Sequence, residues 1–107
     1  MAETIYQLFV MKPAEAWYQL SKEEQERLLA KQNESLEKSG GKNIVFAEST
    51  WSNEEWMYFG VHQYPNCEAL QEHTKRLEEH QWFRYIISKV ILGTEWAGGS
   101  WEGVKVP

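Results

Sequence analysis

His62, Tyr58 and Glu48 are the residues of this sequence whose types could together perform acid/base chemistry. An imidazole titrates near neutrality, and burial would raise the pKa of the Glu48 carboxyl toward the same range. With the Tyr58 phenol beside them in an aromatic cavity, these groups could move a proton on a bound substrate. We therefore predict a catalytic group of three residues with His62 as the base.

Two strand-like segments would bring these side chains together. NIVFAESTW (residues 43–51) and WMYFGVHQY (residues 56–64) are rich in β-branched and aromatic residues, and the polar segment between them suits a hairpin loop. Side chains alternate between the two faces of a strand, so Tyr58 and His62 share one face. The sequence therefore predicts two antiparallel neighbours, with the catalytic residues on one side.

The register of this hairpin decides where Glu48 points. We expect bulky Phe46 to lie opposite Gly60, because a missing side chain leaves space for the ring, and this register puts Glu48 on the face of His62. A slip of one residue would point Glu48 at the helices or at solvent. His62 likewise has an alternative role as a hydrogen-bonded structural histidine.

Residues 4–12 (TIYQLFVMK) alternate as a strand with both faces partly buried. We expect Tyr6, Leu8 and Val10 to pack on helices, together with Met57, Phe59 and Val61 of the later strand. The opposite face would line a barrel cavity. The expected ligand-binding residues are Gln7, Phe9, Met11, Phe46, Trp56 and Tyr64, joined by His80, Trp82 and Phe83 near the cavity mouth.

Two amphipathic helices separate the strands. Ser21 and Glu24 form a capping box at the start of the first helix, which Gly40 and Gly41 end after Ser39. Asn66 is a good N-cap for a second helix over residues 67–80. Residues 81–85 (QWFRY) interrupt the helical periodicity, and IISKVILGTEW (residues 86–96) is rich in β-branched residues, as in a last strand.

The element order is therefore βαββαβ, which predicts an α+β, ferredoxin-like fold with a four-stranded antiparallel sheet and two helices on one face. At 107 residues the chain suits a single domain over 1–107, with its core at about 4–96 and an irregular arm over 97–107. The second sheet face is expected to be aromatic. A homodimer would cover it.

LEEHQWFRYIISKVILG (residues 77–93) and WMYFGVHQYPN (residues 56–66) resemble the dimeric α+β barrel superfamily, in which two ferredoxin-like sheets pack face to face. With the opening KPAEAW and LSKEEQ, the chain is similar to a bacterial family within it that carries no assigned activity. The superfamily includes cofactor-free monooxygenases, cyclases, isomerase-like enzymes, haem-binding proteins and plain ligand binders. The resemblance therefore implies the fold and leaves the chemistry open.

Composition excludes several classes of partner. A net charge of -5 with scattered basic residues argues against nucleic acid, and no segment reaches the length of a membrane span. The single Cys67 suits a reducing, cytoplasmic compartment. His73 and His80 stand seven residues apart, roughly 10 Å along a helix, which is too far for one metal ion. We predict no metal and no cofactor.

Three functions remain open at this point. The first is a cofactor-independent enzyme of monooxygenase, cyclase or isomerase type that acts on an aromatic or hydrophobic substrate. The second is a non-catalytic binding module for a small hydrophobic or aromatic ligand, and the third is a structural dimer whose rings fill its interface. Haem binding through His62 or His80 is a further alternative. Cavity volume separates the ligand-binding functions from the structural one.

Overall fold

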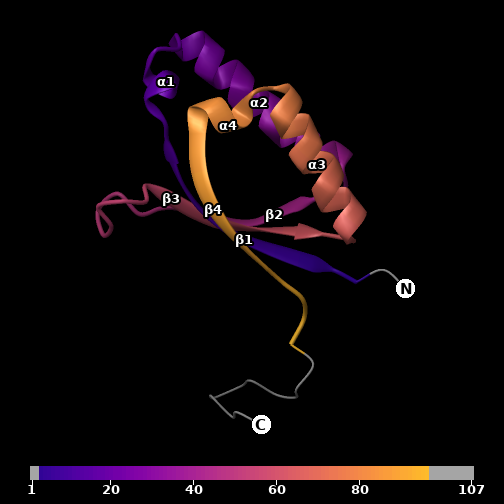
Figure 1. Ribbon diagram of the computed structural model, residues 1–107. Coiled ribbons are helices and arrows are strands. Elements are labelled where there is room, and N and C mark those ends of the chain that lie inside the picture. The colour runs from indigo at the N-terminus through magenta and orange to yellow at the C-terminus, as the bar shows by residue number, and fades with distance from the viewer. Residues whose placement is uncertain (1–2, 97–107) are drawn as a thin grey trace.

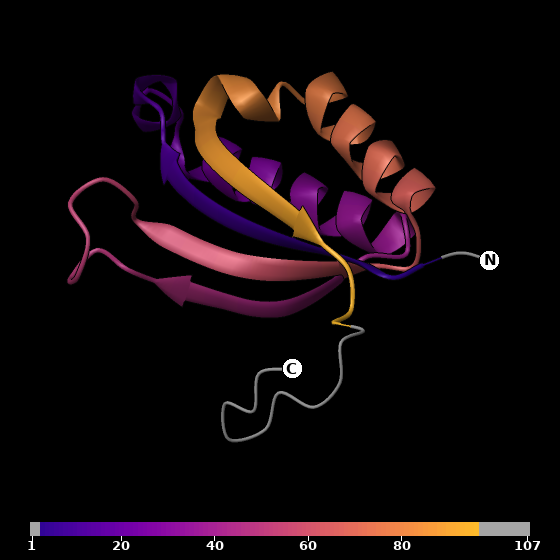
Figure 2. The same cartoon turned by 60° about the horizontal axis from the view of Figure 1, so that its bottom comes forward.

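The computed structural model describes residues 3–96 and shows a four-stranded antiparallel sheet with helices packed on one face (Figures 1 and 2). The elements in chain order are β1 (Ile5–Pro13), α1 (Glu15–Tyr18), α2 (Lys22–Lys38), β2 (Lys42–Glu48), β3 (Tyr58–Tyr64), α3 (Cys67–Glu79), α4 (Trp82–Tyr85) and β4 (Ile86–Gly93). The strand order is β2-β3-β1-β4. The predicted ferredoxin-like α+β fold is confirmed. The single domain stays a prediction, and the arm over 97–107 lies outside the described residues.

Local side chains determine where the two long helices begin and end. At the start of α2, the Glu24 amide donates to Ser21 Oγ at 3.1 Å and the Ser21 amide donates to Glu24 Oε1 at 2.9 Å. At the start of α3, Asn66 Oδ1 accepts from the Ala69 amide at 2.8 Å. Gly40 follows α2 with a φ of 86°, a left-handed conformation that favours glycine. The predicted caps are confirmed.

Two segments differ from their predicted form. Residues 81–85 do more than interrupt the helix, because α4 begins there after Gln81 adopts a φ of 59° and it buries Trp82. The hairpin strands are shorter than expected, since the Ser49 amide donates to the Met57 carbonyl and residues 49–57 then form a loop. Asn53 Oδ1 closes this loop by accepting from the amides of Glu55 and Trp56.

The pairing of β2 with β3 follows the predicted register, with Phe46 opposite Gly60 and Glu48 opposite Tyr58. The prediction of which sheet face packs against the helices is wrong. Met11 packs against Leu28 and Leu77, and Ile5 and Tyr64 pack against Leu36 and Leu70, so this face of β1 and β3 meets the helices. The alternation of residues shows which side chains share a face, but both faces are apolar, so it does not show which face the helices cover.

The opposite side, termed here the open sheet face, carries Leu8, Val10, Phe59 and Val61, which we expected under the helices. Strand pairing places them together with Val45, Ile87 and Ile91. Several are largely exposed, from 39% for Phe59 to 67% for Ile91. The second face is therefore mainly aliphatic, not aromatic.

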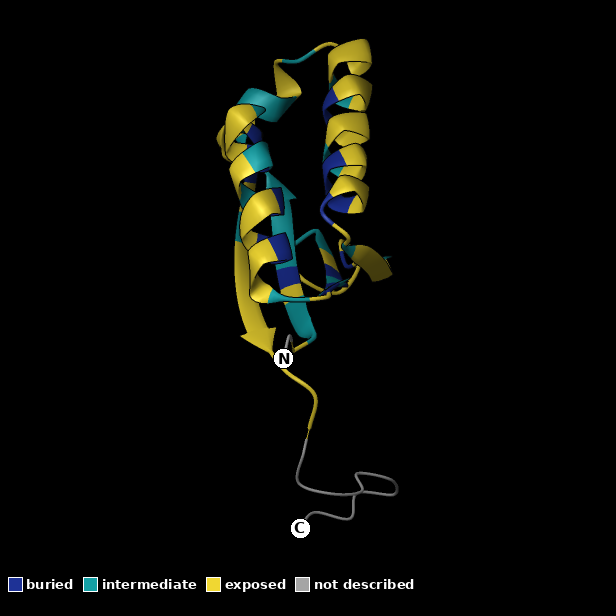
Figure 3. Ribbon diagram, turned by 90° about the vertical axis from the view of Figure 1, so that its right-hand side faces the viewer, coloured by how far each residue is buried: buried dark blue, intermediate teal, exposed yellow. Residues whose placement is uncertain are grey.

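The core under the helices consists of two apolar clusters. Leu28, Leu77, Trp82 and Ile86 form one of them, and Leu36, Tyr64, Ala69 and Leu70 form the other. Figure 3 shows that the buried residues of the long helices gather on their inward-facing sides. The helices are thus anchored to the sheet by separate clusters, which leaves space between them.

Gly60→Val is expected to lower the free energy of unfolding by about 1–3 kcal/mol, which is typical of overpacking. A Cβ at Gly60 would lie 2.5 Å from the Val45 carbonyl oxygen and 2.7 Å from Phe9 Cζ, so Phe9 and not Phe46 fills the glycine's space. Gly93→Val is the matched control, because a Cβ there has no neighbour within 4 Å. Urea denaturation measures both variants. Equal midpoints would contradict this close approach.

Candidate functional site

A cavity of about 640 Å³ lies between the sheet and the long helices. Its walls include Leu77 and Trp82 from one core cluster, Met11 packed against that cluster, and Leu36 and Leu70 from the other. The volume falls within the range typical of small-molecule sites. A structural role in which the rings fill all the available space does not account for such a cavity.

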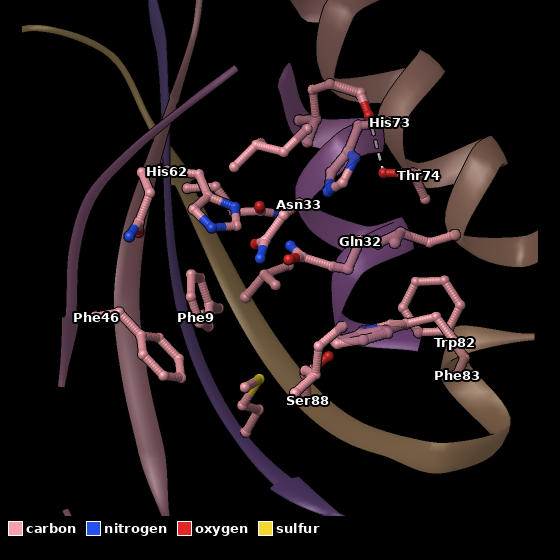
Figure 4. A pocket seen from close by; sticks show the side chains of 18 of the residues that line it. Phe9, Gln32, Asn33, Phe46, His62, His73, Thr74, Trp82, Phe83 and Ser88 are labelled. Atoms are coloured by element: carbon pink, nitrogen blue, oxygen red, sulfur yellow. Dashed lines mark hydrogen bonds between the residues drawn. The ribbon is translucent and has the colours of Figure 1, made fainter. Parts of the chain in front are cut away.

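The cavity wall combines rings and uncharged polar groups. Figure 4 shows Phe9, Phe46 and His62 projecting from the strands toward Gln32, Asn33 and His73 of the helices. The polar side chains of the lining are Gln7, Gln32, Asn33, Asn43, His62, His73, Thr74 and Ser88. Among the residues that the structure describes, no Asp, Glu, Lys or Arg lines this space.

The rings of the sheet form a continuous row. Tyr58 stacks on Phe46 with centroids 5.6 Å apart, Phe46 lies 6.2 Å from Phe9, and Phe9 lies 4.7 Å from His62. Cross-strand pairing produces this row, because Phe46 and Phe9 flank Gly60 on the two neighbouring strands. A planar aromatic ligand could therefore stack against the floor of the cavity.

His62 is held at the inner end of this row and is 8% exposed. Its Nδ1 lies 3.3 Å from the Tyr64 hydroxyl, which in turn donates to Gln7 Oε1 at 3.2 Å. Tyr64 itself is fully buried. Burial without a counter-charge lowers the pKa of His62 from 6.5 to about 4, so the ring is neutral at physiological pH.

His73 of α3 is the most buried of the polar lining residues that sequence reasoning did not assign to the site. It is 2% exposed, its ring centroid lies 6.3 Å from that of His62, and its Nδ1 lies 2.9 Å from Ser35 Oγ. Burial, followed by the positive charge that His62 and Arg76 can carry, lowers the pKa of His73 to about 4, although the Ser35 backbone opposes this shift. Its position between Leu70 and Leu77, three and four residues away, was the available signal for an inward side chain.

The twelve expected site residues separate into three groups. Seven of them line the cavity: Gln7, Phe9, Met11, Phe46, His62, Trp82 and Phe83. Tyr64 lies behind His62 as its hydrogen-bond partner. The remaining four, Glu48, Trp56, Tyr58 and His80, are outside the lining, and His80 instead follows the last turn of α3 as its C-cap.

The catalytic group of three is not assembled at this cavity. Glu48 and Tyr58 share the helix-facing side of the sheet with His62, but Tyr58 stands four residues before His62 on β3, about 13 Å along the strand. Glu48 is exposed and accepts a hydrogen bond from Thr50. Trp56 lies beside Lys12 and Lys89, whose ammonium groups are 5.3 and 5.9 Å from its ring. A role of His62 as a base, without Glu48 and Tyr58, stays a prediction.

Residues 3–96 contain no cluster of three or more His, Cys, Asp or Glu side chains that could hold a metal ion. No helix in that range is long and apolar enough to cross a bilayer. A haem would bring two carboxylates to a cavity whose described lining offers no Lys or Arg to pair with them. The residues present therefore do not fit haem, and no step is assigned to it.

Comparison with solved structures defines the class of fold. The chlorite dismutase-like protein TA0507 matches 88% of this chain with a TM-score of 0.68 at 15% identity, and this chain spans only 46% of that protein's length. The methylated RPA0582 protein matches 94% of this chain and 86% of its own, with a TM-score of 0.63 at 14% identity. A second structure of RPA0582, a protein of unknown function from Rhodopseudomonas palustris, matches 90% and 85% with a TM-score of 0.63 at 13% identity.

These similarities show that the chain shares its ferredoxin-like α+β fold with these proteins, which is the fold that its resemblance to dimeric α+β barrels implied. No family model matches the sequence, and no curated protein is significantly similar to it. At these identities the likeness extends to the fold alone. The function must therefore be argued from the cavity itself.

The free energy of unfolding is expected to fall as the pH drops from 6.5 toward 4. His62 and His73 have pKa values of about 4 in the folded protein and 6.5 in the unfolded chain. Between these values the unfolded chain binds more protons than the folded protein, so the folded protein is fully stable above pH 6.5 and loses stability as the pH falls below it. The loss is as much as about 3 kcal/mol for each histidine. Urea denaturation at several pH values measures it, and His62→Phe should remove about half. A stability that is flat between pH 7 and 5 would contradict buried neutral imidazoles.

Proposed function

We propose that this protein binds a small, neutral aromatic or hydrophobic molecule in the cavity between its sheet and its helices. The observation that carries the proposal is an unfilled space of about 640 Å³ with an aromatic floor and without a charged residue in its described lining. Apolar walls with a few polar groups are characteristic of small-molecule sites. An ionic ligand would lose its hydration here and gain no opposite charge.

The site favours ligand binding over a reaction in which His62 abstracts a proton. A general base works best when its pKa lies near the operating pH. Desolvation lowers the pKa of His62 to about 4, which makes the ring a weak base but leaves it a good hydrogen-bonding group. We therefore assign His62 to ligand recognition and keep the cofactor-independent enzyme as the second candidate.

We further propose that the protein works as a homodimer whose subunits meet at the open sheet face. Leu8, Val45 and Ile87 are 41 to 45% exposed on this face, and Val61 of β3 pairs with both Val45 and Leu8, which connects β2 to β1. A contiguous apolar surface of this kind marks an interface, since soluble monomers rarely expose one. A second copy would supply a matching surface through two-fold symmetry.

Gln32→Trp is expected to abolish ligand binding by filling the cavity. Gln32 lines the cavity from α2, and within residues 3–96 no hydrogen bond of its side chain is found, so the change breaks no bond there. Lys31→Trp is the matched control, because Lys31 is exposed on the same helix and is absent from the lining. Calorimetric titration with 2-naphthol measures both variants. Equal binding by the two would place the ligand elsewhere.

Ile91→Glu is expected to convert the dimer to a monomer, because it buries a charge in the open sheet face. Ile91 is 67% exposed in the single chain, so the change should leave the fold of the subunit intact. Lys31→Glu, on the exposed side of α2, changes charge by a larger amount and should leave the dimer unchanged. Sedimentation equilibrium at micromolar concentration measures the mass. A monomeric unmodified protein would contradict the dimer.

A further inference from the structure

A chain of hydrogen bonds behind the cavity determines which His62 nitrogen carries the proton. The Tyr64 hydroxyl has one proton, and it donates that proton to Gln7 Oε1, which can only accept. The hydroxyl must then accept from its other neighbour, His62 Nδ1, at 3.3 Å. Since the ring is neutral, a proton on Nδ1 leaves Nε2 as a bare acceptor.

The free nitrogen of His62 opens onto the cavity. Among the described side chains, no nitrogen or oxygen is both fully buried and unpaired, and the hydrogen bond of His62 uses Nδ1. His62 lines the cavity, and Figure 4 shows its ring projecting toward Gln32 and Asn33 across the space. A ligand that enters therefore meets an acceptor of fixed identity beside the Phe9 ring.

His73 differs from His62 in this respect. Its partner is the hydroxyl of Ser35, and a hydroxyl can either donate to Nδ1 or accept from it. Its Nε2 can thus present a lone pair or a proton to the cavity. The two histidines together offer one fixed acceptor and one adaptable group.

We propose that the cavity selects a neutral aromatic ligand that carries a hydroxyl group, and that Tyr64 is the positioning residue for this selectivity because it holds His62 in the Nδ1–H form. The hydroxyl of the ligand donates to His62 Nε2 while its rings stack on Phe9. This inference rests on the proposed ligand binding and adds the chemical class of the ligand. An ether or ketone in the same place would bring a second acceptor to Nε2, so the hydrogen bond to His62 would be lost, which is costly in a buried site.

Three matched probes test the inference by calorimetric titration: 2-naphthol, 2-methoxynaphthalene and 2-naphthoate. They share a ring system and differ in offering a hydroxyl donor, an acceptor alone or a negative charge. The expected result is that 2-naphthol binds about tenfold or more tightly than 2-methoxynaphthalene, and that 2-naphthoate binds more weakly than either. If none of the probes binds, the proposed function fails. If 2-naphthol and 2-methoxynaphthalene bind equally, the proposed function stands and this inference is wrong.

Tyr64→Phe tests the positioning role and keeps the buried ring. Without the hydroxyl, His62 can move its proton to Nε2, so the affinity for 2-naphthol should fall several-fold while that for 2-methoxynaphthalene rises. A merely structural role would weaken both probes together, and that result would overturn the assignment. Tyr18→Phe is the control, because Tyr18 is 63% exposed on α1, lies outside the lining and should leave the ratio unchanged. If the unmodified protein prefers 2-methoxynaphthalene, His62 Nε2 carries the proton and the hydrogen bond between His62 and Tyr64 runs in the opposite direction. That result would also overturn the assignment of Tyr64.

Discussion

The contact between the Phe9 ring and the bare backbone of Gly60 is the constraint on which the cavity depends. Phe9 and Gly60 are paired across β1 and β3, and the space of the absent side chain is occupied by the ring. The ring is therefore held over Gly60, close to the sheet. This leaves open the region between the two core clusters and sets Phe9 beside His62.

The chemistry of the site follows from burying polar groups with no charged partner. His62 and His73 lie together in a space whose described lining contains no carboxylate, so each ring is stabilised as a neutral, hydrogen-bonded imidazole. Neutral rings select by the direction of hydrogen bonds and not by charge. Tyr64 and Gln7 supply that direction at His62 from behind the cavity wall.

Features that depend on neighbours along the chain could be predicted from the sequence. The side chains of Ser21 and Asn66 accept hydrogen bonds from helix amides three residues later, as expected. The pairing of Phe46 with Gly60 follows from the expectation that a bulky residue lies opposite a glycine. Strand alternation also grouped Gln7, Phe9 and Met11 correctly on one face.

Features that depend on tertiary packing could not be predicted in the same way. Both faces of the sheet are apolar, so only the packing of Met11 and Tyr64 shows which one the helices cover. Sharing a face did not bring Glu48 to His62, because the hairpin separates them along the strand. The sequence shows His73 only beside His80 on the same helix, whereas its actual partners, Ser35 and His62, lie on α2 and β3.

A crystal structure of the protein with 2-naphthol would show directly whether the cavity binds a hydroxylated aromatic ligand. We expect the naphthalene rings to lie in the cavity against Phe9, with the hydroxyl oxygen within about 3 Å of His62 Nε2, an ordinary hydrogen-bond distance. A probe bound on the open sheet face would contradict the cavity as the ligand site. A probe inside the cavity with its hydroxyl directed away from both histidines would contradict their role in recognition.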